Sequence, residues 1–581
     1  FSFPICKNSD RSLLFHTTMM TLQQRTLRLL IDNSAALYAH HPALVMIGGK
    51  SYSYADLLDN VKTISAVFHN RGIVTGDRIA ILGENRPEWG IAYFSVTTMG
   101  AVAVPILPDF HQTEILHILR HSESKAVIVS RKFLPKIEEN IPPNVTTIII
   151  MDDFTMIPLE GKSGVLSNLL KQGEQEFSIL KEAALKFIGK IPDTVTPDSL
   201  ATIVYTSGTT GHSKGVMLTH SNIVSDVIGT THIVDLNHSD RLLSILPLAH
   251  TYECTLGLTT ALAVGATIYY LDKLPTASVL LPAMKEVKPT VMLSVPLVIE
   301  KIFKTKIYPQ LTGSFLKRRI QKVPFLRKRI HKIAGKKLLT SFGGNLRLFC
   351  IGGAPLAPDV ELFLREALFP YAMGYGLTET SPLIAGTNSQ LTKYRATGKA
   401  LPETTIRIDH PDPDNGEGEI IVKGPTVMRG YYKDDERTAA TFTSDGWLKT
   451  GDLGIIDKEG YIYIKGRSKN MILGSNGKNI YPEEIESIIN EFDLILESLV
   501  YEKDQQIVAR IFIDYDKVEE MFKDDQSSES KTRERISGLL RDLKQQINDR
   551  LPSFSRIANI VEQTEPFEKT PTQKIKRHLY A

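Results

Sequence analysis

The chain has 581 residues, of which 42% are hydrophobic and 23% charged, so collagen-like and wholly disordered classes are excluded. Its length predicts more than one domain. The 68 basic and 65 acidic residues leave a net charge of only +3, which predicts no nucleic-acid partner. Three separated cysteines exclude a disulfide framework and a cysteine zinc site, and they favour a reducing compartment, the cytoplasm.

The first four-fifths of the chain alternates between short apolar runs and amphipathic stretches. After an N-terminal extension (residues 1–20) that we place outside the fold, strands are expected at Asp77–Leu82 and Lys125–Ser130, and helices at Tyr54–His69 and Gln112–His121. This alternation predicts largely parallel α/β sheets. The uncharged run Trp89–Pro108 is interpreted as a buried helix–turn–strand unit and not as a membrane span.

A strongly basic insert spans Lys301–Thr340. It contains 13 Lys and Arg residues and no acidic residue, interspersed with apolar side chains. Pro309 and Pro324 are expected to divide it into two or three short helices. A solvated helical face would explain the charge. An anionic counterpart explains it better, either the inner surface of a membrane or an acidic acyl carrier protein.

The sequence pattern changes after Gly398, from alternating strands and helices to short strands. Short strands at Thr405–Ile408, Gly418–Lys423 and Gly460–Lys465 predict a small antiparallel or barrel-like piece. This piece closes the large domain at residue 466.

Residues 467–581 are predicted to form a small second domain of α+β type. Ile480–Asn490 has the pattern of a helix with Pro482 near its first position, and Ile536–Ile547 marks another helix. The densely charged stretch Asp514–Arg535 between them is expected to be a solvated excursion.

The most informative motif is Tyr205–Gly215, with the sequence YTSGTTGHSKG. It follows an apolar strand pattern and combines hydroxyl side chains, glycines and one lysine. Glycines allow backbone N–H groups to approach a ligand closely, while hydroxyls and lysine donate hydrogen bonds to phosphate oxygens. The motif therefore predicts a phosphate-binding loop, although Lys214 does not occupy the Walker A position.

This loop resembles the signature of the AMP-forming, adenylate-making enzymes, which include acyl-CoA synthetases, luciferases and peptide-synthetase adenylation domains. Five further motifs of that family occur in the same order: Gly352–Pro355, Gly374–Thr380, Thr450–Asp452, Gly466–Arg467 and Thr570–Lys574. The resemblance covers residue 21 to the C-terminus. It implies an AMP-binding catalytic domain of several subdomains (21–466) and a small mobile C-terminal domain (467–581).

The resemblance implies ATP and Mg²⁺ as cofactors and assigns residues to each. The triphosphate would be held by the loop residues Thr206, Ser207, Gly208, Thr209, Thr210, Gly211 and Lys214. Magnesium, a hard cation that prefers oxygen ligands, would be held by Thr206 and Glu379. Tyr375 would stack on adenine. The remaining nucleotide contacts would be Gly353, Ala354, Gly376, Thr378, Asp452 and Arg467.

Four residues are implied in catalysis: Lys574, Thr206, Glu379 and His250. Lys574 resembles the lysine that neutralises charge during adenylation, although TPTQK departs from the Ser-Gly that commonly precedes it. His250 would lie beside the acid. Lys469 would be the pivot about which the small domain turns for the second half-reaction, and Gly474–Lys478 would then face CoA.

Two features favour a fatty acid substrate. Asp445–Gly454 resembles the long-chain fatty acyl signature, and the basic insert resembles that of long-chain enzymes. The leading hypothesis is therefore a long-chain fatty acid:CoA ligase. The alternatives are an acyl–acyl carrier protein synthetase, an adenylate-forming ligase for another carboxylic acid, and a non-catalytic nucleotide-binding protein.

Overall fold

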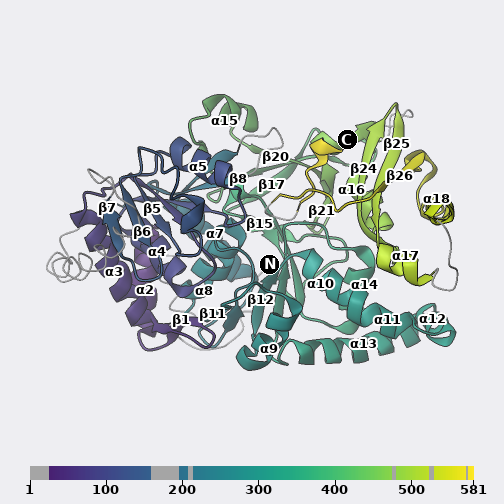
Figure 1. The fold of residues 1–581 in the computed structure, drawn as a ribbon, viewed down its shortest axis with the longest axis horizontal. Helices are drawn as coiled ribbons and strands as arrows, with labels where there is room; N and C mark the ends of the chain where they lie inside the picture. Colours follow the sequence, from purple (N-terminus) through teal and green to yellow (C-terminus); the bar gives the residue numbers. More distant parts are fainter. Residues whose placement is uncertain are drawn as a thin grey trace.

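A computed structural model describes residues 25–158, 195–206, 213–473, 479–521, 529–570 and 574–580 (Figure 1). The expected mixed α/β fold class is confirmed. The proposed extension, residues 1–20, lies outside the described residues.

The first large sheet has eight strands in the order β19-β9-β8-β4-β3-β5-β6-β7. Its central strands are parallel, whereas β9, β19 and β7 pair antiparallel to their neighbours. The strands are β3 (Arg78–Leu82), β4 (Val102–Ile106), β5 (Ala126–Val129), β6 (Thr147–Ile150), β7 (Met156–Pro158), β8 (Leu200–Thr206), β9 (Lys214–Thr219) and β19 (Gly430–Tyr431).

The second large sheet has nine strands in the order β16-β15-β14-β13-β12-β10-β11-β1-β2. The six strands from β14 to β1 are parallel. The strands are β1 (Pro42–Met46), β2 (Ser51–Ser53), β10 (Arg241–Leu243), β11 (Thr267–Tyr270), β12 (Val291–Ser294), β13 (Leu348–Ile351), β14 (Tyr371–Gly376), β15 (Leu383–Gly386) and β16 (Lys399–Ala400).

Helices fill the space between the two sheets. α4 (Pro87–Thr98) contacts β3 and β4 of one sheet and β1 of the other, and all of its residues are buried. A helix that is apolar on every side suits this position, which confirms the helix–turn–strand interpretation of Trp89–Pro108. α2 (Leu27–Tyr38) and α3 (Tyr54–Asn70) pack on α4, and α2 also contacts α7 (His220–Ile233) and α8 (Thr260–Ala263). α5 (Gln112–His121) connects β4 to β5.

The basic insert is helical and lies beside the nine-stranded sheet. A continuous helical stretch runs through α10 (Pro296–Ile302), the π-helix η3 (Phe303–Ile307) and α11 (Tyr308–Thr312), so the expected break at Pro309 is wrong. The chain instead breaks at Gly313–Ser314, before α12 (Phe315–Gln321). Pro324 does begin a new helix, α13 (Pro324–Ser341), which packs on α14 (Pro358–Ala367) and α9 (Ala277–Val287).

The small β piece is an open antiparallel sheet of four strands: β17 (Thr405–Asp409), β18 (Gly418–Lys423), β20 (Leu448–Ile456) and β21 (Ile462–Arg467). The short helix α15 (Asp435–Thr441) lies beside β20.

The C-terminal part is drawn in yellow-green to yellow in Figure 1. It contains β22 (Ile472–Leu473), β23 (Asn479–Ile480), β24 (Ile495–Lys503), β25 (Gln506–Ile513), β26 (Asn559–Gln563), α16 (Pro482–Ile489), α17 (Tyr515–Met521) and α18 (Glu529–Asn548). Pro482 is at the start of α16, as predicted. Within Asp514–Arg535, expected to be a solvated excursion, α17 and the first turns of α18 are helical, and Val518 of α17 is buried.

No helix among the described residues combines the length and apolar character that crossing a bilayer requires.

A buried polar network fixes the segment that leads from β10 to His250. The Asn85 amide donates to the Ser244 hydroxyl (3.0 Å) and to the Leu246 carbonyl (2.5 Å), and its oxygen accepts from the Leu248 N–H (2.9 Å). Ser244 donates in turn to Glu253, whose side chain is buried. The network therefore ties β10 to the π-helix η2 (Tyr252–Thr259).

The Glu253 carboxyl gives this network a pH dependence. Burial raises its pKa to about 8, and only the hydrogen bond from Ser244 opposes the rise. The folded state therefore keeps the proton while the unfolded chain releases it, so stability should fall as the pH rises from about 5 to 8.

Replacing Glu253 by Gln should remove this part of the pH dependence, because the amide keeps an acceptor for Ser244 and cannot ionise. In urea unfolding at graded pH, the wild type should lose up to about 1.4 kcal/mol per pH unit relative to Glu253→Gln. The exposed Glu286→Gln serves as the control and should keep the wild-type slope. Parallel slopes for wild type and Glu253→Gln would show that Glu253 is ionised in the fold.

Candidate functional site

The candidate residues gather where parallel strands of the nine-stranded sheet end. Tyr375 lies at the carboxyl end of β14, Gly352 and Gly353 follow β13, and His250 follows β10. In open α/β sheets this edge is where ligands bind. Sheet topology thus brings together motifs that are more than a hundred residues apart.

Two glycines of these motifs have structural reasons to be glycine. Gly353 has φ +85°, a left-handed conformation that other residues rarely adopt. A Cβ on Gly376 would lie 1.8 Å from the carbonyl oxygen of Pro382. Ala354 is exposed, and Thr378 begins the short helix η4 (Thr378–Thr380).

The ends of the predicted phosphate loop are placed by the β8–β9 hairpin. Thr206 and Lys214 are cross-strand partners, so the loop between them leaves and re-enters the sheet at one point. The loop residues predicted to bind phosphate, Ser207, Gly208, Thr209, Thr210 and Gly211, lie outside the described residues. The Thr206 hydroxyl is buried and has no hydrogen-bond partner within the described part of the chain. A buried hydroxyl without a partner is costly, so its position fits a ligand.

Lys214 forms a three-way contact with Glu379 and Tyr431. Its ammonium lies 2.6 Å from a Glu379 carboxylate oxygen and donates to the Tyr431 hydroxyl at 2.8 Å, and that hydroxyl donates to the same Glu379 oxygen at 2.9 Å. The ammonium also lies 4.4 Å from the centre of the Tyr431 ring. Burial alone would favour the neutral forms, but the ion pair outweighs it, so the pKa of Lys214 is raised and that of Glu379 is lowered. Both groups are charged at neutral pH.

Asp452 forms a second polar cluster with Tyr375 and Arg467. The Tyr375 hydroxyl donates to one carboxylate oxygen (2.8 Å), and Arg467 pairs with the other (2.8 Å). Asp452 and Arg467 are cross-strand partners in β20 and β21, which explains why residues 15 positions apart meet. Burial raises the pKa of Asp452, while Arg467, Tyr375 and Lys574 act in the opposite direction.

Lys574 reaches the same region from the C-terminal part of the chain. Its backbone is bonded to Thr570: the Thr570 N–H donates to the Lys574 carbonyl (2.7 Å), and the Lys574 N–H donates to the Thr570 hydroxyl (3.2 Å). Protein surrounds much of its side chain, although solvent still reaches it. Its pKa is lowered by this partial burial first and by Arg467 second, whereas Asp452 and Glu379 act in the opposite direction. The charge of Lys574 therefore interacts both with the Asp452 cluster and with Glu379 of the Lys214 contact.

His250 is held as a neutral ring. Its Nδ1 accepts a hydrogen bond from the Tyr252 N–H (3.1 Å), which leaves the ring proton on Nε2. Burial lowers the pKa of His250 to about 4, and the charge of Lys574 contributes. The ring therefore offers a neutral N–H donor.

The remaining predicted residue, Lys469, is not gathered into either cluster. It lies exposed on the short helix η5 (Ser468–Asn470), between β21 and β22. The loop Gly474–Lys478, predicted to face CoA, lies outside the described residues.

The oxygen donors of the site are Glu379 and the Thr206 hydroxyl. The described residues hold no cluster of three or more His, Cys, Asp or Glu side chains placed for a metal ion. Magnesium commonly takes one or two carboxylates and completes its shell with water and phosphate oxygens. Glu379 and the unpartnered Thr206 hydroxyl fit that role, provided that Glu379 shares its charge with Lys214.

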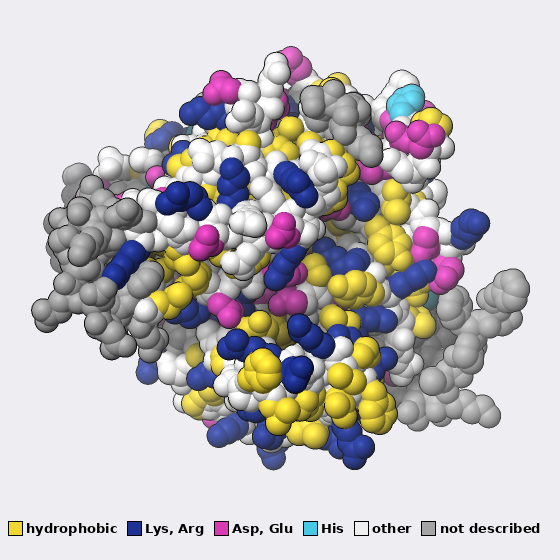
Figure 2. All heavy atoms as spheres, turned by 90° about the vertical axis from the view of Figure 1, so that its right-hand side faces the viewer, with side chains coloured by type: hydrophobic (Ala, Val, Ile, Leu, Met, Phe, Trp, Pro, Cys, Tyr) yellow, Lys and Arg dark blue, Asp and Glu magenta, His cyan; other side chains and the backbone are white. Residues whose placement is uncertain are grey.

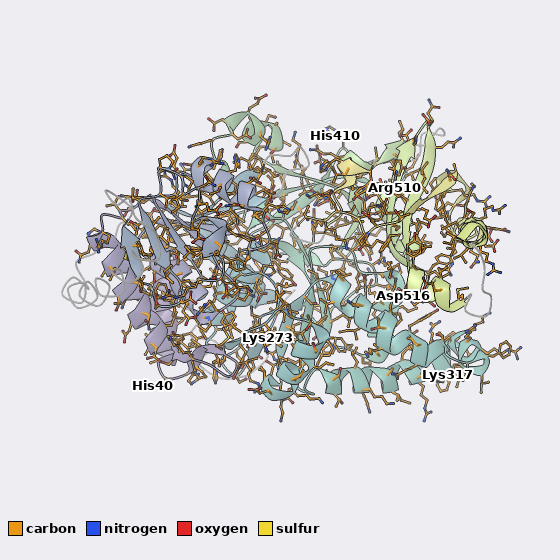
Figure 3. All side chains as sticks on the ribbon, in the orientation of Figure 1. His40, Lys273, Lys317, His410, Arg510 and Asp516 are labelled. Atoms are coloured by element: carbon orange, nitrogen blue, oxygen red, sulfur yellow. The ribbon has the colours of Figure 1, made fainter. Side chains whose placement is uncertain are left out.

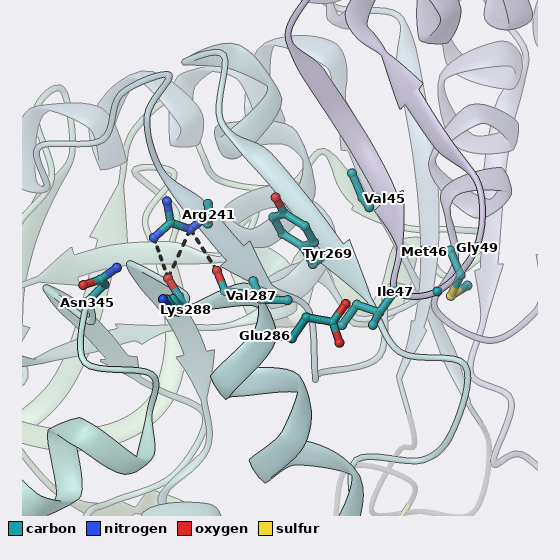
Figure 4. A pocket seen from close by; sticks show the side chains of 11 residues that line it. Val45, Met46, Ile47, Gly49, Arg241, Tyr269, Glu286, Val287, Lys288 and Asn345 are labelled. Atoms are coloured by element: carbon teal, nitrogen blue, oxygen red, sulfur yellow. Dashed lines mark hydrogen bonds between the residues drawn. The ribbon is translucent and has the colours of Figure 1, made fainter.

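A separate cavity of about 630 Å³ lies between β1, β11 and α9 (Figure 4). None of the candidate residues lines it. Arg241, at the opposite end of β10 from the His250 segment, directs its guanidinium to the backbone carbonyls of Val287 and Lys288. The arginine is therefore engaged in holding the backbone of α9 and its C-terminal residue.

Comparison with known proteins identifies the family. Residues 31–432 match the model of the AMP-binding enzymes. The chain is 30% identical over 478 residues to the long-chain-fatty-acid–CoA ligase FadD15 of Mycobacterium bovis, covering 77% of this chain and 74% of that protein. It is 30% identical over 487 residues to the peroxisomal long chain acyl-CoA synthetase 6 of Arabidopsis thaliana, covering 78% and 67%.

Solved structures share the fold. An ATP-bound RpMatB-BxBclM chimera superposes with a TM-score of 0.73 at 24% identity, covering 96% of this chain and 98% of that chain. The o-succinylbenzoate CoA synthetase MenE of Bacillus subtilis, in complex with ATP and magnesium, gives 0.70 at 23% identity, covering 94% and 98%. The chain therefore belongs to the family of AMP-binding enzymes. Within it, the chain is an adenylate-forming acyl-CoA ligase.

Sequence reasoning missed Tyr431 and the Asn85–Ser244–Glu253 network. Tyr431 reaches Lys214 because β19 pairs with β9. No local motif marks that long-range pairing.

Proposed function

We propose that the protein is a long-chain fatty acid:CoA ligase that uses ATP and magnesium. The observation that carries the substrate class is the set of relatives at about 30% identity over three-quarters of the chain, which are long-chain acyl-CoA ligases. In the first half-reaction a carboxylate oxygen of the acid bonds to the α-phosphorus of ATP while the bond to the β-phosphate breaks. The products are acyl-AMP and pyrophosphate.

Different residues of the site bind different groups of the reactants in this step. Thr206 and Lys214, at the two ends of the loop between β8 and β9, bind the triphosphate. Lys574 offsets the negative charge that develops around the α-phosphorus. Tyr375 and Thr378 orient the nucleotide, and Asp452 with Arg467 binds the ribose. Magnesium, held by Glu379 and Thr206, would neutralise further phosphate charge.

In the second half-reaction the CoA thiolate bonds to the acyl carbon and AMP leaves. We assign to Lys469 the pivot that turns residues 467–581 between the two steps. Its exposed position between β21 and β22 is compatible with a hinge. His250, as a neutral donor, is placed to orient the carboxylate of the acid.

The substrate class is tested by pyrophosphate release across saturated acids from butyrate to stearate. We expect kcat/KM to rise by up to about fourfold for each added methylene until the pocket is filled, because each buried CH₂ contributes about 0.8 kcal/mol. A preference for short, aromatic or dicarboxylic acids would contradict the proposal. Repeating the assay with CoA and with holo-acyl carrier protein decides the acceptor, and the proposal requires CoA.

Lys574→Ala should separate the two half-reactions. We expect formation of acyl-AMP to fall about 100-fold or more, because a cation aimed at the developing charge is lost. Transfer from supplied acyl-AMP to CoA should stay within a few-fold of wild type. Lys576→Ala, two residues further along the chain, is the matched control and should leave both rates unchanged. Equal loss of both half-reactions in Lys574→Ala would assign the lysine a structural role.

Glu379→Gln should raise the magnesium concentration that gives half-maximal pyrophosphate release, since an amide is a poorer ligand for a hard cation. Because Glu379 also pairs with Lys214, the variant should be less stable to heat. Tyr431→Phe removes a hydroxyl from the same contact but keeps the carboxylate, and it should leave the magnesium dependence unchanged. If Glu379→Gln loses stability with an unaltered magnesium dependence, Glu379 serves only as the partner of Lys214.

A further inference from the structure

The helix pair at the lower right of Figure 1 ends in a region that we call the tip, residues 313–329. None of the residues of α12 is buried. Phe315, Leu316 and Phe325 are 75%, 68% and 72% exposed, and Val323 and Leu326 are exposed as well. These side chains therefore add nothing to the hydrophobic core. A contiguous group of large exposed apolar side chains marks an interaction surface.

The tip is also strongly basic. Of the 13 Lys and Arg residues of the insert, Arg327 is the one that pairs with a carboxylate among the described residues, through Glu366 on α14 (2.8 Å). Lys317, Lys322, Lys328 and Arg329 are exposed. Figure 2 shows Lys and Arg side chains around the hydrophobic side chains at the lower end of the molecule, and Figure 3 shows Lys317 at the outer end of the helices.

The orientation of α13 keeps this surface open. His331, Gly335 and Leu338 form its buried face, and a Cβ on Gly335 would lie 2.7 Å from Ala367 of α14. Arg329 and Ile333 lie on the opposite face, and Ile333 is 55% exposed. On α12, the Arg319 guanidinium lies 5.3 Å from the centre of the Phe315 ring, so charge and aromatic surface are presented together.

We propose that the tip docks on the surface of a bilayer that contains anionic phospholipids. Lys and Arg side chains would bind the headgroups, while Phe315, Leu316 and Phe325 would enter the boundary between headgroups and acyl chains. The mixture favours lipid over a protein partner, because residues 313–329 carry seven Lys and Arg residues and no acidic residue among exposed apolar side chains, which is the composition of a segment that lies on an anionic lipid surface. Docking would allow the protein to collect an acid that is dissolved in the lipid, and this purpose rests on the proposed function. The docking itself does not rest on it.

Co-sedimentation of the full chain with vesicles tests the proposal without measuring catalysis. The probes are vesicles of phosphatidylcholine alone and of equimolar phosphatidylcholine and phosphatidylglycerol, at low and high salt. We expect binding to the anionic vesicles at low salt, and weaker binding as salt screens the charges.

Two tip variants and two matched controls separate charge from apolar contact. The basic variant replaces Lys317, Lys322, Lys328 and Arg329 by Gln, and its control replaces the exposed Lys50, Lys273, Lys458 and Lys503. The apolar variant is Phe315→Ser with Phe325→Ser, and its control is Leu274→Ser with Leu391→Ser. We expect each tip variant to bind anionic vesicles at least tenfold more weakly than wild type, and each control to bind as wild type does.

Turnover of a water-soluble medium-chain acid should be the same in all four variants, since none of these residues lies in the site. Failure of the wild type to bind anionic vesicles at low salt overturns the proposal, as does equal binding by tip variants and controls. Capture of acyl carrier protein by the wild type, lost in the basic variant and without vesicle binding, would assign the tip to a protein partner instead. A protein that binds vesicles but activates no fatty acid would contradict the proposed function alone.

Discussion

The ion pair between Lys214 and Glu379 is the contact on which the site depends, because it joins the two large sheets. Lys214 begins β9 of the eight-stranded sheet, and Glu379 follows β14 of the nine-stranded sheet. Both charges are largely buried, and the Tyr431 hydroxyl contacts both. Breaking such a pair leaves an uncompensated charge, which is far more costly than losing an exposed salt bridge. The ion pair therefore holds Lys214 in place, and with it Thr206, its cross-strand partner at the other end of the phosphate loop.

The Asp452 cluster connects the nine-stranded sheet to the small antiparallel sheet. Tyr375 comes from the nine-stranded sheet, Asp452 and Arg467 from the small antiparallel sheet, and Lys574 from the C-terminal part. A carboxylate whose pKa is raised by burial is stabilised here by neighbouring cations. Lys574 comes from the C-terminal part of the chain and acts on this cluster through its charge.

Local patterns were sufficient for much of the fold. The apolar run Trp89–Pro108 and the helix beginning at Pro482 were predicted, because burial on all sides and proline at a first turn leave clear signals. Charge alone did not reveal the secondary structure at Asp514–Arg535, where α17 and the first turns of α18 are helical although densely charged. Tyr431 could not be predicted, because its contact with Lys214 arises from strand pairing across 217 residues. The resemblance of the motifs predicted Asp452 and Arg467 as nucleotide contacts. The register of β20 and β21 explains why the two side chains form an ion pair.

That register limits how the chain can vary. Asp452 and Arg467 face each other across the β20–β21 hairpin, whose turn is closed by hydrogen bonds to Asp457. β21 already carries one extra residue between this pair and the turn, a bulge at Lys465, and Asp452 pairs with Arg467 with that bulge in place. Because side chains alternate between the two faces of a strand, a further residue inserted there would move one partner to the wrong face. Insertions at the turn itself would leave the pair in place. Length differences among natural or engineered variants of this hairpin should therefore concentrate at the turn and be absent from its strands.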